Sequence, residues 1–166
     1  MNRAPTFAKV STVIYWSRTY EIRKNNMLEI RQFNPEDKKT VIDLWQQCNL
    51  VVPWNDPEKD IQRKLDAGAE LFLVGEFEEK LVASVMGGYD GHRGWIYYLA
   101  VAPRFRHRGF AQAMMSEMES QLKNLGCPKI NLLVRNTNTD VIEFYQSLGY
   151  AMDQSVSLGK RLIPDD

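Results

Sequence analysis

The stretch of the chain that decides its fold is residues 99–111, which read LAVAPRFRHRGFA. Its first residues end an apolar run that is typical of a strand, and Pro103 closes that run. A basic, glycine-containing loop follows, and the apolar residues after the loop recur at helical spacing. The order of strand, proline turn, basic loop and helix predicts an anion-binding loop at the start of a helix.

The physical basis of this prediction is the first turn of the helix. Its N–H groups have no intrahelical partner, and the aligned peptide dipoles add partial positive charge there. Gly109 lets a phosphate approach the backbone. Further positive charge comes from Arg104, Arg106, His107 and Arg108. An ordinary solvated basic turn is the alternative, and neither GxxxxGK[ST] nor GxGxxG occurs in the chain.

Composition limits the partners of the chain. The 166 residues hold 21 Lys and Arg against 21 Asp and Glu, so the net charge is zero and any anion site must be local. We therefore expect neither nucleic acid nor a membrane as the main partner, and no apolar run approaches the roughly 20 residues that span a bilayer. Cys48 and Cys127 show no metal-like spacing, which predicts no metal site, reduced thiols and a cytoplasmic location.

The first 26 residues differ from the rest, with five basic residues and one acidic residue. Such a stretch fits an organelle transit peptide or a leader added by an upstream start codon, with Met27 as the true start. Regular patterning begins directly after Met27, which favours the second interpretation. We expect residues 1–26 to be largely disordered and residues 27–166 to form one domain.

The pattern from residue 27 onward predicts alternating strands and helices. We expect strands at residues 28–33, 71–77, 81–89, 95–101, 129–134 and 150–158. Asn34, Asp56 and Asn138 are expected to cap helices. Helical core faces are expected at Val41, Leu44, Trp45 and Cys48, at Ile61 and Leu65, at Ala111, Met114, Met115, Met118, Leu122 and Leu125, and at Val141, Ile142, Tyr145 and Leu148. The fold class is therefore α/β with a mixed sheet, which begins antiparallel and continues in β-α-β crossovers.

Two motifs together resemble one family. Residues 106–111, RHRGFA, are similar to the acetyl-CoA signature [QR]xxGx[GA] of the GNAT acetyltransferases, and LAVAP before them matches the usual approach to it. Residues 138–150, NTDVIEFYQSLGY, resemble the family's NxxAxxxYxxxG[FY], with Val141 in place of alanine. The order of strands and helices also matches the family from residue 28 to residue 158.

The resemblance implies a central mixed sheet with helices on both faces and a splay between the fourth and fifth strands. The pantetheine arm of acetyl-CoA would lie in that splay like an extra strand, and a backbone N–H of residues 99–101 would hold the developing oxyanion. Contacts to the coenzyme are implied at Leu99, Ala100, Val101, Arg106, His107, Arg108, Gly109, Phe110, Ala111, Asn138 and Tyr145. Asn138 is expected to serve both as helix cap and as coenzyme contact.

The implied reaction is direct transfer of an acetyl group from acetyl-CoA to a primary amine of a small molecule, peptide or protein. No metal and no covalent enzyme intermediate is needed. Tyr145 matches the family's proton donor to the departing thiolate, and a phenol with a reference pKa of about 10 suits that role. Its alternative role is that of a core aromatic.

The general base has no family match in this chain. Many members carry a glutamate on the strand that here spans residues 95–101, and this strand has no carboxylate. Asp90 and His92 in the preceding turn and Asp56 are the candidate bases. Each also has an ordinary role, as a turn residue, a surface histidine or a helix cap.

The acceptor pocket is expected between the loop after the first helix and the opposite side of the splay. It would recruit Trp54, Asn55, Asp56, Tyr89, Arg93, Tyr97 and Tyr98. Trp54 is equally well explained as a hydrophobic lid on the core, and Arg93 suits a substrate carboxylate. The fold does not choose the acceptor, and the chain is expected to be a monomer or a homodimer.

Two other functions remain open from the sequence. The missing strand glutamate allows a coenzyme A-binding sensor or interaction module without catalysis. The basic cluster around Arg106 allows a polyanion binder, which would bind with steep salt dependence. The neutral net charge argues against that binder, and it gives no reason for residues 138–150.

Overall fold

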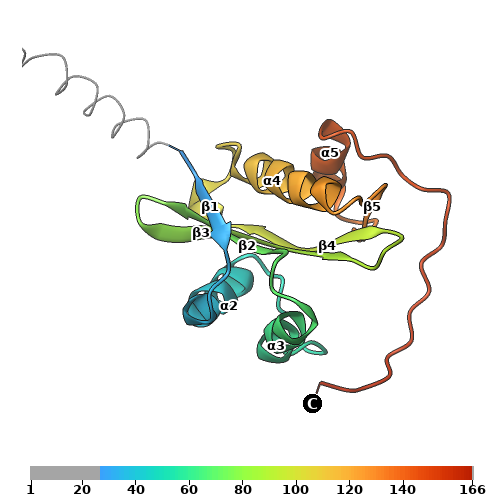
Figure 1. Cartoon of the computed structure of the whole chain (residues 1–166), viewed down its shortest axis with the longest axis horizontal. Coiled ribbons are helices and arrows are strands. Elements are labelled where there is room, and N and C mark those ends of the chain that lie inside the picture. The colour runs from blue at the N-terminus through green and yellow to red at the C-terminus, as the bar shows by residue number, and fades with distance from the viewer. Residues whose placement is uncertain (1–26, 166) are drawn as a thin grey trace, which may run out of the picture.

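The computed structural model describes residues 27–165, so the expectations for residues 1–26 lie outside the described residues. One mixed sheet forms the centre of the molecule (Figure 1). In chain order the elements are β1 (Glu29–Gln32), the 3-10 helix η1 (Pro35–Asp37), α2 (Lys38–Gln47), α3 (Pro57–Ala67), β2 (Phe72–Phe77), β3 (Lys80–Tyr89), β4 (Gly94–Val101), the 3-10 helix η2 (Pro103–Phe105), α4 (Phe110–Asn124), β5 (Ile130–Leu132) and α5 (Thr139–Ser147).

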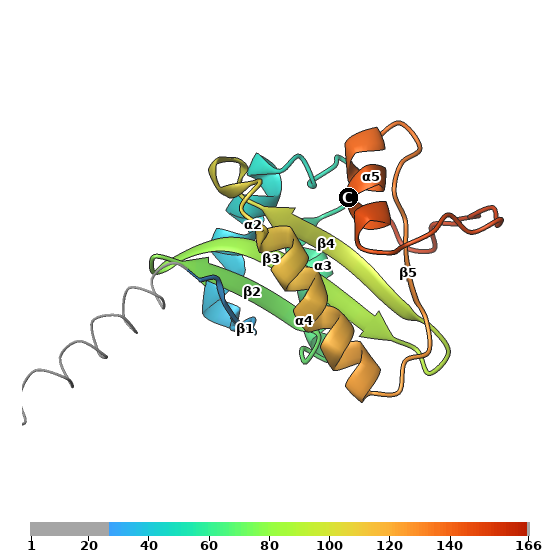
Figure 2. The ribbon, with the colours of Figure 1, turned by 90° about the horizontal axis from the view of Figure 1, so that it is seen from above.

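The sheet has the strand order β1-β2-β3-β4-β5. The first four strands pair antiparallel and β5 pairs parallel to β4. Helices α2 and α3 cover one face, and α4 and α5 lie on the other (Figures 1 and 2). The predicted mixed sheet with helices on both faces is therefore confirmed. Within residues 27–165, no helix is long and apolar enough to cross a membrane.

Local sequence signals account for the helix starts on the α2 and α3 face. The Asn34 side chain accepts a hydrogen bond from the backbone N–H of Glu36, and Asp37 closes a capping box with Asn34. The carboxylate of Asp56 accepts hydrogen bonds from the first-turn N–H groups of α3. Both predicted caps are confirmed.

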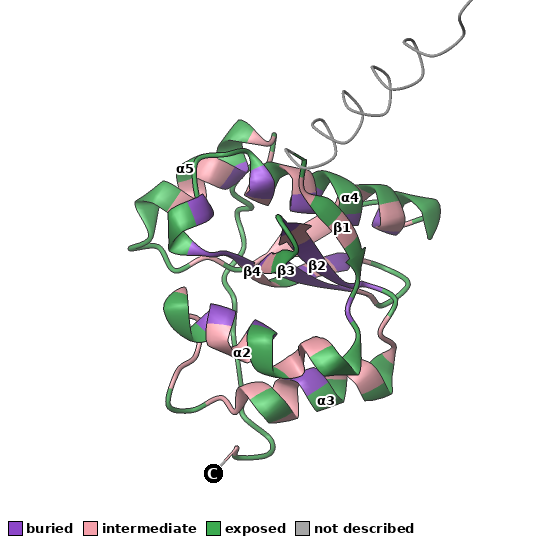
Figure 3. Cartoon of the chain, turned by 90° about the vertical axis from the view of Figure 1, so that its left-hand side faces the viewer, coloured by how far each residue is buried: buried purple, intermediate pink, exposed green. Residues whose placement is uncertain are grey.

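The core lies between the sheet and its two helix layers (Figure 3). The predicted core faces of α2 and α4 are buried at Val41, Leu44, Trp45, Met114, Met115, Met118 and Leu122. Leu125, which was expected in the same stripe, is 56% exposed. That prediction was wrong because α4 ends at Asn124 and Leu125 is its C-cap, so Leu125 no longer belongs to the helical stripe.

The fourth and fifth strands separate after a short contact. Their pairing is limited to Gly94–Ile130, Trp95–Asn131 and Ile96–Leu132. Strand β4 continues to Val101 along β3 alone, whereas β5 ends at Leu132. The predicted splay between these strands is confirmed, and β5 is shorter than the predicted strand at residues 129–134.

The predicted last strand at residues 150–158 is wrong. This segment has no regular secondary structure, and Met152, Val156 and Leu158 are 78%, 86% and 91% exposed. Alternating apolar residues form a stable strand only when a neighbouring strand shares their hydrogen bonds and covers one face. The segment instead leaves α5 as an extended arm, whose start is held by an ion pair between Lys129 and Asp153 at 2.6 Å.

Two adjacent glycines in β3 give a test of the core packing. A Cβ atom on Gly87 would lie 2.4 Å from Sδ of the buried Met118, whereas one on Gly88 would meet no atom within 4 Å. We expect Gly87→Ala to lower the free energy of unfolding by about 1–3 kcal/mol, because the fully buried side chain of Met118 must leave its packed position to admit the methyl group. Urea unfolding measures this loss. Gly88→Ala is the control and should stay within about 0.5 kcal/mol of the wild type; equal losses would contradict the packing.

Candidate functional site

The loop between β4 and α4 has the backbone of an open anion cradle. Gly109 is the N-cap of α4 in the left-handed conformation, with φ 80°, and no side chain caps the helix. His107 also has a positive φ of 60°. No atom beyond the chain neighbours lies within 4 Å of the place where a Cβ of Gly109 would stand. The first N–H groups of α4 are therefore accessible to a ligand of the size of a phosphate.

Positive side chains surround this cradle. Arg106, His107 and Arg108 are exposed. The guanidinium carbon of Arg108 lies 5.4 Å from the ring centroid of Phe105 and 5.7 Å from that of Phe77, in cation–π contact. Nε of Arg106 donates a hydrogen bond to the carbonyl of Val101 at 3.3 Å. These contacts keep the charges beside the helix start and leave most of their N–H donors available.

Main-chain donors line the gap that opens beyond the β4–β5 contact. The N–H of Ala102 donates to the carbonyl of Val82 at 2.8 Å, on the β3 side. Because successive N–H groups of a strand point to opposite edges, the N–H of Val101 points toward the gap. The side chain of Val101 is buried, so this residue can contribute only its backbone to a ligand in the gap. By the same alternation the N–H of Ala100 points to β3, where Ala100 pairs with Ser84.

Strand β4 contains a bulge at the edge of this gap. Ser84 pairs with Ala100 and Met86 with Tyr97, so Tyr98 and Leu99 together stand opposite one residue of β3. Tyr98 has φ 51°, a left-handed conformation that costs a non-glycine residue roughly 1–2 kcal/mol. The bulge changes the direction in which the next N–H groups of β4 point.

The side chain of Tyr98 reaches from the bulge to the α2 and α3 layer. Its ring stacks on Trp45 with 4.0 Å between centroids, and its hydroxyl donates to Oδ2 of Asp60 at 2.6 Å. Burial, together with this hydrogen bond and the negative charge of Asp60, raises the pKa of Tyr98 well above its usual value. Sequence reasoning missed Asp60, because its contact with Tyr98 joins residues 38 positions apart and no local pattern marks it.

Tyr145 lies on α5 and is almost fully buried, with 8% of its surface exposed. Its ring makes edge-to-face contacts with Phe144 and Tyr150, at centroid distances of 5.1 and 5.6 Å. Burial raises the pKa of Tyr145 to about 12. Burial is the only cause of this shift, and no hydrogen bond within residues 27–165 engages the Tyr145 hydroxyl, so it is a protonated donor that is free for another partner.

Asn138 occupies the N-cap position of α5, as predicted, but its side chain makes no capping hydrogen bond. Its backbone has φ −96° and ψ 70°, outside the extended conformation typical of an N-cap. The predicted capping role of the side chain is therefore wrong. The exposed amide of Asn138 keeps its donors and its acceptor for another partner.

The predicted residues of the β3–β4 turn lie apart from the bulge. Oδ1 of Asp90 accepts hydrogen bonds from the backbone N–H groups of Arg93 and His92, at 2.7 and 2.8 Å, and these bonds hold the pKa of Asp90 below its usual value. The Tyr89 hydroxyl donates to the carbonyl of Gly91 at 3.2 Å. The bulge begins four residues after Gly94, the first residue of β4. At the usual rise per residue, this places the turn residues about 13 Å or more from the bulge along the strand.

The other predicted acceptor residues lie nearer to the bulge, on the α3 side. Asn55 and Asp56 lead into α3, where Asp56 serves as the cap. Trp54 is 57% exposed, so its side chain is not packed into the core as a hydrophobic lid would be. Tyr97 is half exposed. The structure thus brings the Asn55 side chain to the Tyr98 hydroxyl and leaves the turn residues at the far end of β4.

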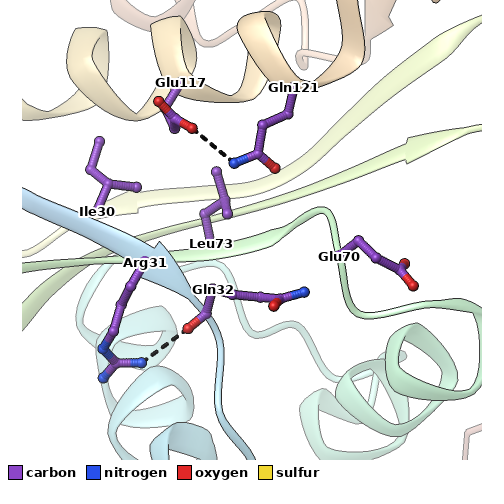
Figure 4. Close-up of a pocket in the computed structure, with 7 residues that line it drawn as sticks. All are labelled: Ile30, Arg31, Gln32, Glu70, Leu73, Glu117 and Gln121. Carbon is purple, nitrogen blue, oxygen red and sulfur yellow. Dashed lines mark hydrogen bonds between the residues drawn. The ribbon is translucent and has the colours of Figure 1, made fainter. Parts of the chain in front are cut away.

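A separate hollow of about 440 Å³ lies between β1, β2 and α4 (Figure 4). Its lining residues are Ile30, Arg31, Gln32, Glu70, Leu73, Glu117 and Gln121. Gln121 donates to Glu117 at 2.9 Å, and Arg31 to the carbonyl of Gln32 at 3.1 Å. None of the predicted site residues lines this hollow. It also lacks an open helix start, because Glu117 and Gln121 lie in the middle of α4, so we place the candidate site at the gap beside β4.

Comparisons with known proteins give the family of the chain. The model of the Acetyltransferase (GNAT) family matches residues 38–150. A curated relative from Yersinia enterocolitica, named an acetyltransferase, is 54% identical over 138 residues, which are 83% of this chain and 98% of that protein.

Solved structures share the fold at lower identity. Ard1 from Thermoplasma volcanium matches with a TM-score of 0.69 and 24% identity, over 76% of this chain and 84% of that one. A predicted acetyltransferase from Clostridium acetobutylicum, solved with acetyl-CoA, matches with a TM-score of 0.62 and 17% identity, over 80% of this chain and 96% of that one.

The N-cap residues of α3 and α5 give a test of the local geometry. We expect Asp56→Ala to lower the free energy of unfolding by about 1 kcal/mol, because the Asp56 carboxylate accepts from the N–H groups of Glu58 and Lys59 at 2.9 and 3.3 Å. Asn138→Ala should change it by less than about 0.5 kcal/mol, since no capping bond is lost. Urea unfolding of both variants measures the difference. A loss at Asn138 as large as that at Asp56 would show that its amide caps α5 after all.

Proposed function

Because this chain belongs to the GNAT acetyltransferase family, we propose that it moves an acetyl group directly from acetyl-CoA to a primary amine of a small molecule, peptide or protein. The observation that carries the proposal is the unpaired edge of β4 beside the open start of α4. The strand edge can pair with the extended, amide-containing arm of the coenzyme, and the helix start can bind the phosphates at the end of that arm.

The residues around Gly109 are proposed to hold the pyrophosphate of acetyl-CoA. The open space at Gly109 admits a phosphate to the first N–H groups of α4. Arg106 and Arg108 supply the neighbouring positive charge, His107 is an exposed ring N–H donor beside them, and Phe110 and Ala111 supply first-turn N–H groups. The residues present therefore fit the group, and the solved structural neighbour from Clostridium acetobutylicum holds the same ligand.

The edge of β4 is proposed to align the pantetheine arm. Backbone groups of Leu99, Ala100 and Val101 adjoin the gap, and the N–H of Val101 points into it. A fixed N–H donor in this position stabilises negative charge that develops on the carbonyl oxygen as the amine attacks. This donor needs no reorganisation, because the bulge and the β3 ladder already fix the strand.

Tyr145 is proposed to give its proton to the departing thiolate of coenzyme A. Its raised pKa keeps the phenol protonated at neutral pH, and its hydroxyl is not committed to a structural hydrogen bond. Asn138, two turns earlier on the chain, is proposed as a contact to the coenzyme through its uncommitted side chain amide. The proton leaves Tyr145 as the carbon–sulfur bond breaks, and solvent restores it.

The acceptor is proposed to enter on the α3 side of the gap, past Trp54, Asn55 and Tyr98. Asp90 is a poor candidate for the base, because two backbone hydrogen bonds favour its charged form and lower its proton affinity. His92 lies in the same distant turn, and Asp56 is engaged as a helix cap. We therefore propose that the amine reacts from its neutral fraction or loses its proton through water.

The donor site is tested by calorimetric titration of acetyl-CoA. We expect saturable one-to-one binding by the wild type, and at least tenfold weaker binding after Arg106 and Arg108 are both changed to alanine, since two charge-assisted contacts to phosphate are lost. Lys123→Ala is the matched control, because Lys123 lies in the last turn of the same helix, about 20 Å away. It should bind like the wild type. Equal binding by the control and the double variant would contradict the proposed cradle.

The acid is tested by Tyr145→Phe. We expect kcat to fall by a factor of about 10²–10⁴, while the Kd for acetyl-CoA changes little, because the substitution removes a proton donor and keeps the ring packing. In the wild type, a pKa of about 12 leaves the phenol protonated, so kcat should show no loss from Tyr145 up to about pH 10. Steady-state release of coenzyme A against pH measures both effects. Unchanged turnover would remove Tyr145 as the acid and leave the donor site intact.

A further inference from the structure

The bulge of β4 is held from outside the sheet. We propose that Asp60 is a positioning residue, which acts through the Tyr98 hydroxyl to fix the bulge and thereby the direction of the N–H groups that follow it. The catalytic part of this inference rests on the proposed acetyl transfer. The structural part concerns only the described chain and can be tested without a substrate.

The backbone of Tyr98 needs such support. Its φ of 51° is a conformation that bulky side chains rarely adopt, because the Cβ atom crowds the following carbonyl. A residue keeps a conformation of this kind only when its surroundings fix it more strongly than the local strain opposes it. Without that support the strand would relax toward ordinary pairing. A shift of one residue in the register would then point every side chain after the bulge to the opposite face of the sheet.

Three contacts made by Trp45 of α2 and Ser84 of β3 hold the backbone and the ring of Tyr98. Nε1 of Trp45 donates to the hydroxyl of Ser84 at 2.9 Å, and this hydroxyl donates to the carbonyl of Tyr98 at 3.3 Å. The rings of Trp45 and Tyr98 stack at 4.0 Å with 17° between their planes. Ser84 and Trp45 are fully buried, so this closed set of contacts is rigid.

Asp60 adds a contact from a different element. Its Oδ2 accepts from the Tyr98 hydroxyl at 2.6 Å, and its Oδ1 accepts from Nη1 of Arg63 at 3.0 Å. A carboxylate accepts a stronger hydrogen bond than a neutral group does, and Arg63 restricts the rotation of this carboxylate. Stacking alone leaves the Tyr98 ring able to slide over Trp45. The hydrogen bond to α3 fixes the far end of the ring and so removes that freedom.

This arrangement links the two sides of the proposed reaction centre. Helix α3 begins at the acceptor-side residues Asn55 and Asp56, and Asp60 lies one turn later. Tyr98 is followed by Leu99, Ala100 and Val101, whose backbone adjoins the gap. A shift of α3 would therefore move the backbone of residues 99–101, because the Tyr98 side chain connects the two. Asp60 has the role of positioning the strand, and it is not required to touch either substrate.

Hydrogen exchange of the ligand-free protein tests the structural part. We expect Asp60→Ala and Tyr98→Phe to raise the exchange rate of a peptide covering residues 97–101 by about tenfold or more, because both lose the same hydrogen bond. Asp60→Asn keeps an acceptor oxygen and should stay near the wild type. Asp43→Ala is the matched control, since Asp43 is a half-exposed carboxylate paired with Lys39 on α2. Unchanged exchange in both Asp60→Ala and Tyr98→Phe would overturn the inference.

Turnover and binding test the catalytic part. We expect Asp60→Ala and Tyr98→Phe each to lower kcat by about tenfold, with the Kd for acetyl-CoA within about twofold of the wild type, and the double variant to be no worse than the poorer single one. Asp60→Asn should restore most of the rate. Losses that multiply in the double variant would overturn the inference. If the wild type transfers no acetyl group to any amine, the proposed function fails, and the exchange experiment still decides whether Asp60 holds the bulge.

Discussion

The separation of β4 from β5 is the constraint on which the rest of the site depends. A strand in the middle of a sheet normally forms hydrogen bonds to a neighbouring strand on each side. Where one side is unpaired, its free N–H and C=O groups can pair with another extended chain. Here the contact with β5 ends after Ile96 and Leu132, yet β4 continues along β3 for five more residues. The chain thus keeps a rigid strand with one open edge, and the edge is available to an extended ligand because no strand of the described chain fills it.

The open edge is useful only because the elements at its two ends are fixed. At its C-terminal end, the left-handed Gly109 turns the chain directly into α4, whose core residues Met114, Met118 and Leu122 anchor the helix against the sheet. The helix start and its arginines are therefore held in place by packing far from the loop. At the near end, the bulge at Tyr98 changes the direction of the strand just before the groups that line the gap. Both features use backbone conformations that are costly for most residues, which is typical of functional regions in an otherwise regular fold.

How much of this arrangement the sequence predicts depends on how local each feature is. The loop at residues 106–111 and the caps at Asn34 and Asp56 rest on neighbouring residues, and hydrophobic periodicity predicts the elements that the structure contains. The bulge cannot be read from residues 95–101, because a bulge exists only relative to the partner strand. The contact of Asp60 with Tyr98 joins a helix and a strand 38 positions apart, so neither motif includes it. The strand expected at residues 150–158 failed for the same reason, since its alternating pattern says nothing about the neighbour it would need.

In the proposed reaction, the groups that serve the donor lie on one face of the sheet and the groups that support Tyr98 lie on the other. The face with α4 and α5 carries Gly109, Asn138 and Tyr145, all groups proposed to serve the donor (Figure 2). The face with α2 and α3 carries Trp45 and Asp60, which hold Tyr98 and border the proposed acceptor entry. Successive side chains of a strand point to opposite faces of the sheet, so β4 packs against both helix layers. A change in the packing of Tyr98 on one face would therefore alter the backbone that serves the donor on the other. Substitutions in α2 or α3 that alter the acceptor pocket must therefore preserve the support of Tyr98, because a shift there would disturb the donor edge as well.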